Sequence, residues 1–277
     1  MSRAAPPAPG RLRHELRLVA VALQFLTRVP VRLQAFDPQW LHASARHFPL
    51  VGAGVGAFGA GVLLLALLPW PPLVAVGLSM AATVWLTGGF HEDGLADTCD
   101  GLGGAVSRER ALAIMKDSRL GSYGALGLCL TLALKASVLT LLAAQDAWAA
   151  AGALVLAHAG SRAATVALLA ALPYGGDPEH AKAKPLAQRI GRFGLGVALA
   201  WVLLLGAALA GAVNAGADPA PWPPLRLLGA ALAAAGVAVV CARWLRRRLG
   251  GYTGDGLGAT QQWTELAIYL ALAADVG

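Results

Sequence analysis

Four acidic residues stand close together near position 95, in a chain in which only 13% of residues are charged. They are Glu92, Asp93, Asp97 and Asp100, with no lysine or arginine among them. The three aspartates are spaced four and three residues apart, so on a helix they share one face. Carboxylates stacked in this way repel one another, and Mg²⁺, a hard cation that prefers oxygen ligands, would remove that repulsion. The spacing therefore predicts a magnesium site that handles phosphates, with Glu92 as a further ligand or an adjacent acceptor.

A second polar cluster follows at residues 115–124. Lys116 and Arg119 lie three residues apart and could clamp phosphate oxygens, while the Ser118 hydroxyl could donate a hydrogen bond. A loop whose basic residues only set membrane topology would have the same composition. The position of the 115–124 cluster shortly after the acidic run favours phosphate binding.

A third cluster lies at residues 250–259, a glycine-rich stretch that follows three arginines. Such a turn can present backbone amides to a phosphate, although glycine-rich loops are frequent. Thr253 could cap a helix or contact the phosphate. Asp255 is a candidate metal ligand or acid–base group.

The elements that must position these clusters are membrane helices, because 57% of residues are hydrophobic and the mean hydropathy is +0.61. Two short segments, 16–29 and 263–276, could lie in the interface or cross only partly. The pattern predicts an all-α, polytopic membrane bundle of about six to eight transmembrane or interfacial helices, forming one domain over residues 1–277. Six apolar runs meet the length needed to cross a bilayer and are predicted as spans: 48–68, 72–89, 125–144, 148–172, 193–213 and 225–242.

Three basic side chains fall inside these runs, where ionisable groups are costly and indicate function. Arg162 is favoured as a substrate-binding residue. His158, four residues earlier, is interpreted as a packing residue. Lys135 has no motif beside it, so a purely structural role is favoured for this residue.

The distribution of lysine and arginine indicates the topology. Nineteen of the 22 lie in four regions, 1–47, 88–124, 173–192 and 243–262, while the connections between alternate spans hold none. The positive-inside rule places these regions, and with them the acidic run, on the cytoplasmic side of the inner membrane. The net charge of +7 is accounted for by this topology, so no nucleic-acid partner is expected. Residues 1–10 read as a disordered tail, and the oligomeric state is left open, a homo-oligomer included.

Three motifs together resemble the cobalamin-5'-phosphate synthase family, also called adenosylcobinamide-GDP ribazoletransferase. They are residues 89–101, 115–124 and 251–262, in the family's order, and Phe25-Leu-Thr-Arg-Val-Pro30 is similar to its N-terminal signature. The resemblance spans the chain. Glu92 stands where the family often has an apolar residue, which leaves its role in doubt and the aspartates unaffected.

The resemblance implies a Mg²⁺-dependent membrane transferase. Adenosylcobinamide-GDP and α-ribazole, or its 5'-phosphate, would give adenosylcobalamin, or its 5'-phosphate, and GMP. The metal would be held by the acidic run, and Lys116 and Arg119 would steady the developing charge. One carboxylate, Asp100 or Asp255, would accept the hydroxyl proton.

Two other functions compete with this interpretation. The string from Asp97 to Gly101 is similar to part of the CDP-alcohol phosphotransferase motif, but the rest of that motif is missing. A cation-coupled transporter would place its acids near the bilayer midplane, whereas here they follow a predicted span. The sequence has no Walker phosphate loop, which excludes an ATPase of that type.

Overall fold

The computed structural model describes residues 10–33, 37–176, 190–215 and 221–274. The predicted tail, except Gly10, and the basic residues Lys182, Lys184 and Arg189 lie outside these ranges. Within them the secondary structure is helical with no strand, which confirms the predicted all-α bundle. The elements are α1 (Arg11–Leu26), α2 (Pro38–Ser44), a 3₁₀ turn (Ala45–His47), α3 (Phe48–Ala66), α4 (Pro72–Thr87), α5 (Phe90–Leu102), α6 (Arg108–Met115), α7 (Ser122–Gln145), α8 (Ala147–Ala171), α9 (Arg192–Asn214), α10 (Pro224–Leu249) and α11 (Gly254–Ala273).

Helix α8 is the centre of the bundle. It begins where the Asp146 carboxylate accepts hydrogen bonds from the N–H groups of Trp148 and Ala149, at 2.8 and 2.9 Å. Its sequence is rich in alanine, and small side chains let neighbouring helices approach closely. Helices α3, α9 and α11 all pack against it, so 83% of its most apolar window is buried.

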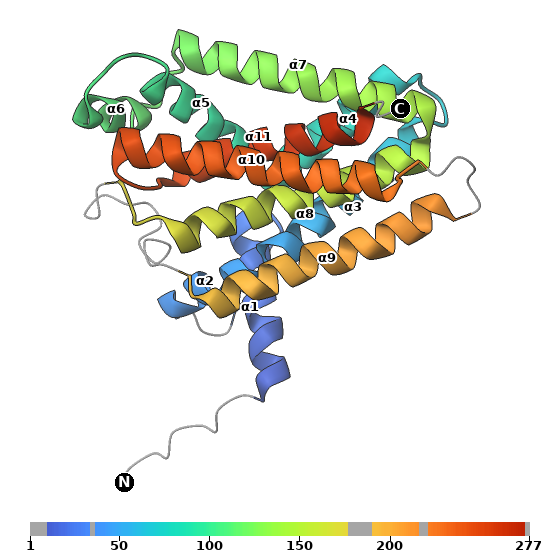
Figure 1. Ribbon diagram of the computed structural model, residues 1–277, viewed down its shortest axis with the longest axis horizontal. Coiled ribbons are helices and arrows are strands. Elements are labelled where there is room, and N and C mark those ends of the chain that lie inside the picture. The colour runs from blue at the N-terminus through green and yellow to red at the C-terminus, as the bar shows by residue number, and fades with distance from the viewer. Residues whose placement is uncertain (1–9, 34–36, 177–189, 216–220, 275–277) are drawn as a thin grey trace.

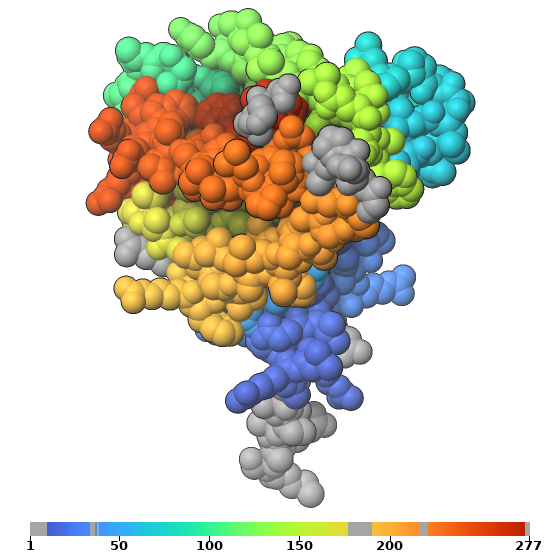
Figure 2. Space-filling model, turned by 45° about the vertical axis from the view of Figure 1, so that its right-hand side comes forward, coloured from blue at the N-terminus to red at the C-terminus, as the bar shows by residue number. Residues whose placement is uncertain are grey.

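Helices α9 and α10 form an outer face of the bundle beside α7 (Figure 2). Only 11% of the apolar window of each is buried, and the exposed side chains include Leu203 at 72% and Val240 at 65%. Apolar side chains that face outward along such long helices suit contact with lipid tails. Figure 1 shows α7, α8, α9 and α10 running side by side, while α1 leaves the bundle steeply.

Five helical stretches are long and apolar enough to cross a membrane, and a sixth span requires α4 and α5 together. The prediction of residues 72–89 as an independent span needs correction. Helix α4 has 16 residues, which is about 24 Å at 1.5 Å per residue, short of a hydrocarbon core of about 30 Å. The chain then bends by 89° into α5, so the acidic helix is the second arm of a broken span or a re-entrant element.

The helices of the two doubtful terminal segments, α1 and α11, are both outside the set of stretches that could span. Helix α11 begins at Gly254, nine residues before the start expected at Trp263, so much of the predicted glycine-rich turn is helical. Its side chains are buried along nearly its whole length, because it lies between α5, α8 and α10.

Three of the predicted basic regions meet at one end of the bundle. The Arg108 guanidinium donates to the carbonyls of Leu249 (2.9 Å) and Gly175 (2.8 Å). Arg248 donates to the carbonyls of Leu102 (3.0 Å) and Gly104 (2.9 Å). The loops after α5, α8 and α10 are thereby linked to one another. Figure 1 shows these loops together at the end where α7 begins.

Candidate active site at the acidic helix

A pair of glycines sets the direction of the acidic helix. Gly88 and Gly89 have φ values of 73° and 70°, in the left-handed region that is open to glycine and costly for residues with a Cβ. The chain can therefore turn sharply, and α5 starts at Phe90. Its first turn carries Glu92 and Asp93, so the bend brings two of the four predicted ligands to the end of α4.

An open groove of about 690 Å³ lies beside this bend. Its charged lining consists of Glu92, Asp93 and Arg28, the last from the segment after α1. Small-molecule sites have volumes in this range, and carboxylates beside a cation suit a metal-bound phosphate ester. The other lining residues are mostly apolar: Phe25, Thr87, Gly88, Gly89, Phe90, Ala96, Leu120 and Leu128.

Asp100, at the far end of the acidic face, has a different environment. Its carboxylate accepts hydrogen bonds from the backbone N–H groups of Gly121 and Gly124, both at 2.8 Å. These glycines stand at the start of α7, where unpaired N–H groups and the helix dipole favour a negative charge. Asp100 therefore anchors α7 to α5, while its role in metal binding and catalysis stays a prediction. Asp97, one turn earlier, is half-buried.

The third motif packs directly against the first. A Cβ placed on Gly94 of α5 would lie 2.9 Å from the carbonyl oxygen of Asp255 and 3.0 Å from its Cα. A Cβ on Gly258 would lie 3.2 Å from the Cα of Gly94. Only glycine permits this approach of α5 and α11. The element that approaches Gly94 is the first turn of α11.

Thr253 is the N-cap of that turn, as its sequence position suggested. Its hydroxyl accepts a hydrogen bond from the N–H of Gly256 at 3.0 Å, and only 4% of the residue is exposed. The structure therefore places Thr253 as a capping residue that orients α11. A direct contact with substrate stays a prediction.

The second motif borders the groove through Leu120. Lys116, Ser118 and Arg119 are exposed, and Arg119 forms an ion pair with Asp117 at 2.6 Å. The hydrogen bonds from Arg119 lower the pKa of Asp117 to about 2, and the same pairing raises the pKa of Arg119. The guanidinium that was predicted to hold phosphate is therefore held by its own loop.

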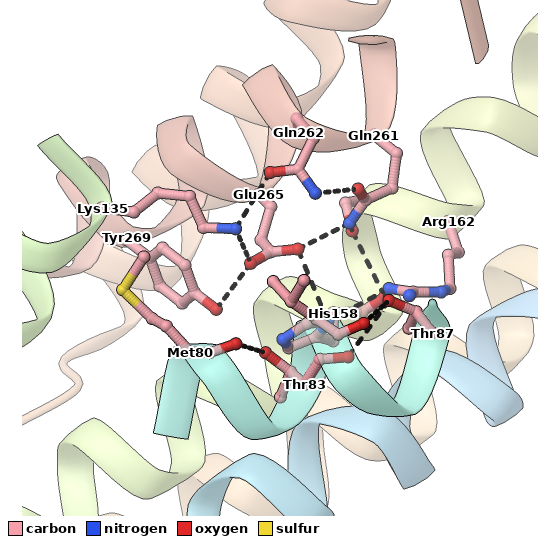
Figure 3. A network of polar contacts seen from close by, with 12 residues as sticks. Met80, Thr83, Thr87, Lys135, His158, Arg162, Gln261, Gln262, Glu265 and Tyr269 are labelled. Carbon is pink, nitrogen blue, oxygen red and sulfur yellow. Dashed lines mark hydrogen bonds and ion pairs between the residues drawn. The ribbon is translucent and has the colours of Figure 1, made fainter. Parts of the chain in front are cut away.

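A network of charged and polar side chains lies inside the bundle, and the sequence analysis missed most of it. Glu265 of α11 is its centre: Lys135 Nζ lies 2.6 Å from Oε1, and His158 Nδ1 lies 3.4 Å from Oε2. The Tyr269 hydroxyl donates to Oε1 at 3.1 Å. Figure 3 shows these side chains converging on Glu265 from α7, α8 and α11.

Arg162 belongs to this network and not to the lining of the open groove. Its Nη1 donates to the carbonyl oxygen of His158 at 2.9 Å, and only 1% of the residue is exposed. His158, predicted to pack, is therefore also a polar partner of Arg162. The role of Arg162 in substrate binding stays a prediction.

Two glutamines connect the network to the acidic helix. Gln262 Nε2 donates to Glu92 Oε1 at 2.9 Å, and Gln261 Nε2 donates to Glu265 Oε2 at 2.6 Å. A small internal cavity of about 20 Å³, room for one ordered water, lies among these groups and shares Glu92 with the groove. Glu92 thus stands in the wall between the open groove and the buried network.

The groove residues fit a hard divalent cation. The available donors are carboxylate oxygens, and the buried Oε2 of Glu92 has no hydrogen-bond partner among the described residues. Within the same part of the chain, no three His, Cys, Asp or Glu side chains form a ready-made metal cage. Mg²⁺ does not need one, because it is usually held by one or two carboxylates, waters and substrate phosphates.

Several signals for the missed residues were present in the sequence. Arg28 lies within the N-terminal signature, between residues 25 and 30. Lys135 and Glu265 are opposite charges in two apolar runs, which predicts pairing inside a membrane bundle. The contact of positions 130 residues apart depends on how α7 packs against α11, which no local pattern encodes.

Similarity to known proteins extends over almost the whole chain. A family model described as cobalamin-5-phosphate synthase matches residues 18–273. A protein of Leptothrix cholodnii named adenosylcobinamide-GDP ribazoletransferase is 62% identical over 266 residues, which cover 96% of this chain and 98% of the relative. Proteins of the same name from Albidiferax ferrireducens and Shewanella amazonensis are 46% and 44% identical, cover 95% and 94% of this chain, and match over 98% and 96% of their own lengths. No solved structure matches the chain.

Proposed function

Because the chain belongs to the cobalamin-5-phosphate synthase family, we propose that it joins α-ribazole, or its 5'-phosphate, to adenosylcobinamide-GDP. The ribose hydroxyl attacks the phosphorus on the cobinamide side of the pyrophosphate. The bond from that phosphorus to the bridging oxygen breaks, and GMP leaves with that oxygen. The products are adenosylcobalamin, or its 5'-phosphate, and GMP.

One observation supports this reaction above the others: Glu92, Asp93 and Arg28 face one groove of about 690 Å³. A pyrophosphate is strongly anionic, and its displacement needs positive charge near the phosphorus and the departing oxygen. Bound Mg²⁺ would supply that charge, held by Asp93 and Glu92 with Asp97 one turn further along the acidic face. The Arg28 guanidinium can donate two parallel hydrogen bonds to phosphate oxygens.

The proton of the attacking hydroxyl goes to a carboxylate in this proposal. Both oxygens of Asp100 already accept backbone N–H groups, so that carboxylate is engaged in holding the start of α7. Asp255 is the better candidate, because its backbone lies against Gly94, between two acidic residues of α5. The start of α11, which packs closely against α5, would hold Asp255 in place.

The site would face the cytoplasm from the inner membrane. The acidic helix ends beside Arg108, at the start of α6, and Arg248, in the last turn of α10, which meet at one end of the bundle. Basic loops are retained on the cytoplasmic side, where guanine nucleotides and Mg²⁺ are also found. Adenosylcobinamide-GDP and α-ribazole would reach the groove from that side.

The test is turnover by the full chain in lipid nanodiscs. Adenosylcobinamide-GDP and α-ribazole are supplied with Mg²⁺, and release of GMP is followed by chromatography, with excess EDTA as the matched control. The proposal expects GMP and a cobalamin product that both require the metal. Full activity in EDTA would reject the magnesium site. Release of CMP from a CDP-activated lipid, with no turnover of the corrinoid donor, would assign the alternative transferase.

A further inference from the structure

We propose that Gln262, with its amide oriented by Lys135, is a positioning residue that holds Glu92 at the groove with one oxygen available to a divalent cation. This inference rests on the proposed function, whose metal site it extends to residues inside the bundle. Gln262 and Lys135 are 2% and 5% exposed, and neither lines the open groove. Any effect they have on the metal must therefore pass through another side chain.

The polarity of the Gln262 amide is fixed from both sides. Lys135 Nζ donates to its Oε1 at 3.1 Å, and its Nε2 donates to Glu92 Oε1 at 2.9 Å. An ammonium group can only donate and a carboxylate can only accept. Rotating the amide by 180° would set NH₂ against NH₃⁺ and a carbonyl against a carboxylate. Lys135 thereby ensures that Gln262 presents a donor to Glu92.

Lys135 is itself held in place. It forms an ion pair with Glu265 at 2.6 Å, and Glu265 accepts further hydrogen bonds from Tyr269 and Gln261. All these groups are buried, where hydrogen bonds to charged partners are strong and rearrangement leaves a costly unpaired charge. Helices α7 and α11 thus supply a rigid frame behind a single carboxylate.

Glu92 has the geometry that such a frame would serve. Its Oε1 is engaged by Gln262, whereas its Oε2 is buried and has no partner in the described part of the chain. A buried carboxylate oxygen without a donor is unfavourable, and the groove that Glu92 lines offers room for a cation. Side chains that orient a metal ligand in this way commonly change metal affinity 10- to 100-fold when removed.

The experiment is a double-mutant cycle on Mn²⁺ affinity, measured by electron paramagnetic resonance on the full chain in nanodiscs without substrates. Gln262→Met keeps the size of the side chain and removes the donor. We expect it to weaken Mn²⁺ binding about 10-fold or more. In a Glu92→Ala background the same change should have no further effect, because Gln262 acts only through Glu92.

Thr264→Val is the matched control, since Thr264 lies on the same helix, is fully buried, and its hydroxyl has no described partner. It should leave Mn²⁺ affinity unchanged. Lys135→Met alone would leave Glu265 an unpaired buried charge, so Lys135→Met/Glu265→Gln tests the orienting role and should reproduce the loss seen in Gln262→Met. Melting temperatures without metal verify that each variant is folded.

Losses from Gln262→Met and Glu92→Ala that simply add would overturn the inference, as would unchanged Mn²⁺ affinity in Gln262→Met. These outcomes would leave GMP release by the wild type untouched, so they are distinct from failure of the proposed function. Absence of any Mn²⁺ binding by the substrate-free wild type would overturn the inference, whereas GMP release that still requires Mg²⁺ would uphold the proposed function.

Discussion

The carboxylate of Asp100 lies 2.8 Å from the backbone nitrogen of Gly124 and accepts its hydrogen bond. The contact joins the end of the acidic helix to the first turn of the next long helix. An aspartate at a helix N-terminus satisfies N–H groups that would otherwise lack partners. Asp100 therefore has a structural role at the start of α7, beside the metal-binding role that is predicted for it.

This contact bears on the phenotypes of two substitutions. Asp97→Ala should abolish GMP release. Asp100→Ala should abolish release and also destabilise the protein by about 1–3 kcal/mol, because the start of α7 loses a charged acceptor. Thermal unfolding in detergent and a turnover assay measure both effects. Near-wild-type activity in either variant would count against the assigned metal site.

Gly94 should be intolerant of a side chain. Gly94→Val would place carbon atoms within about 3 Å of the Asp255 backbone, so α5 and α11 must separate. We expect a destabilisation of about 1–3 kcal/mol and loss of turnover. Gly77→Ala is the control, because a Cβ at Gly77 meets nothing within 4 Å. Equal stability and activity of the two variants would show that the close approach is dispensable.

Arg28 should bind the nucleotide donor. Arg28→Ala removes the guanidinium that lines the groove, and hydrogen bonds to charged groups contribute about 1.5–3 kcal/mol. We expect the KM for adenosylcobinamide-GDP to rise roughly 10- to 100-fold. Arg32→Ala, an exposed arginine four residues along and outside the groove lining, should have little effect. A matching loss in both variants would indicate a general effect of charge near the membrane.

The Asp117–Arg119 pair should regulate the second motif. Lys116→Ala and Arg119→Ala should each weaken donor binding or slow turnover, if these cations contact phosphate. Asp117→Asn should have the opposite effect and tighten donor binding several-fold, since it releases the guanidinium from its ion pair. Steady-state kinetics separate KM from kcat in each variant. Unchanged KM and kcat in all three variants would indicate that the basic residues of this loop only set the membrane topology.

The docking of α1 should weaken in acid. Burial raises the pKa of Glu15, but hydrogen bonds from Arg46 and His47 outweigh it, so the pKa lies below its usual 4.5. A carboxyl with a lowered pKa stabilises the fold above its usual pKa. That stabilisation is lost as the pH falls through the lowered value.

Hydrogen exchange of α1 should therefore be slow and constant from pH 7 to about 5, once corrected for the intrinsic rate, and should accelerate below about pH 4. Glu15→Gln should remove this pH dependence. An identical acid response in Glu15→Gln would assign the effect to another group.

The features that the sequence predicted correctly are local ones. The acidic helix follows from the four- and three-residue spacing of its aspartates, and the Thr253 cap follows from its place before Gly254. The lengths of the apolar runs located the long helices, and the three motifs together identified the family. Each of these depends on residues within a few turns of one another.

The features that were missed depend on packing between distant segments. The apolar segment 263–276 covers only part of α11, because the polar residues Gln261 and Gln262 stand before it on the same helix. In the bundle they point inward and form hydrogen bonds with Glu92, Lys135 and Glu265. Their polar side chains are therefore buried and do not face solvent. The residues at 88–89 were expected to end a span, but a left-handed pair that redirects the chain by 89° has no signature beyond two glycines.

That redirection has a consequence for the size of molecule that can react. The groove lies at the corner between two helices, where Phe25, Phe90 and Leu120 line it, and not along the inner surface of the central helix. In the proposed reaction, only the pyrophosphate tail of the corrinoid has to enter this corner. The macrocycle can rest against the outside of the protein at the membrane boundary, so the bundle needs no tunnel wide enough for the whole donor.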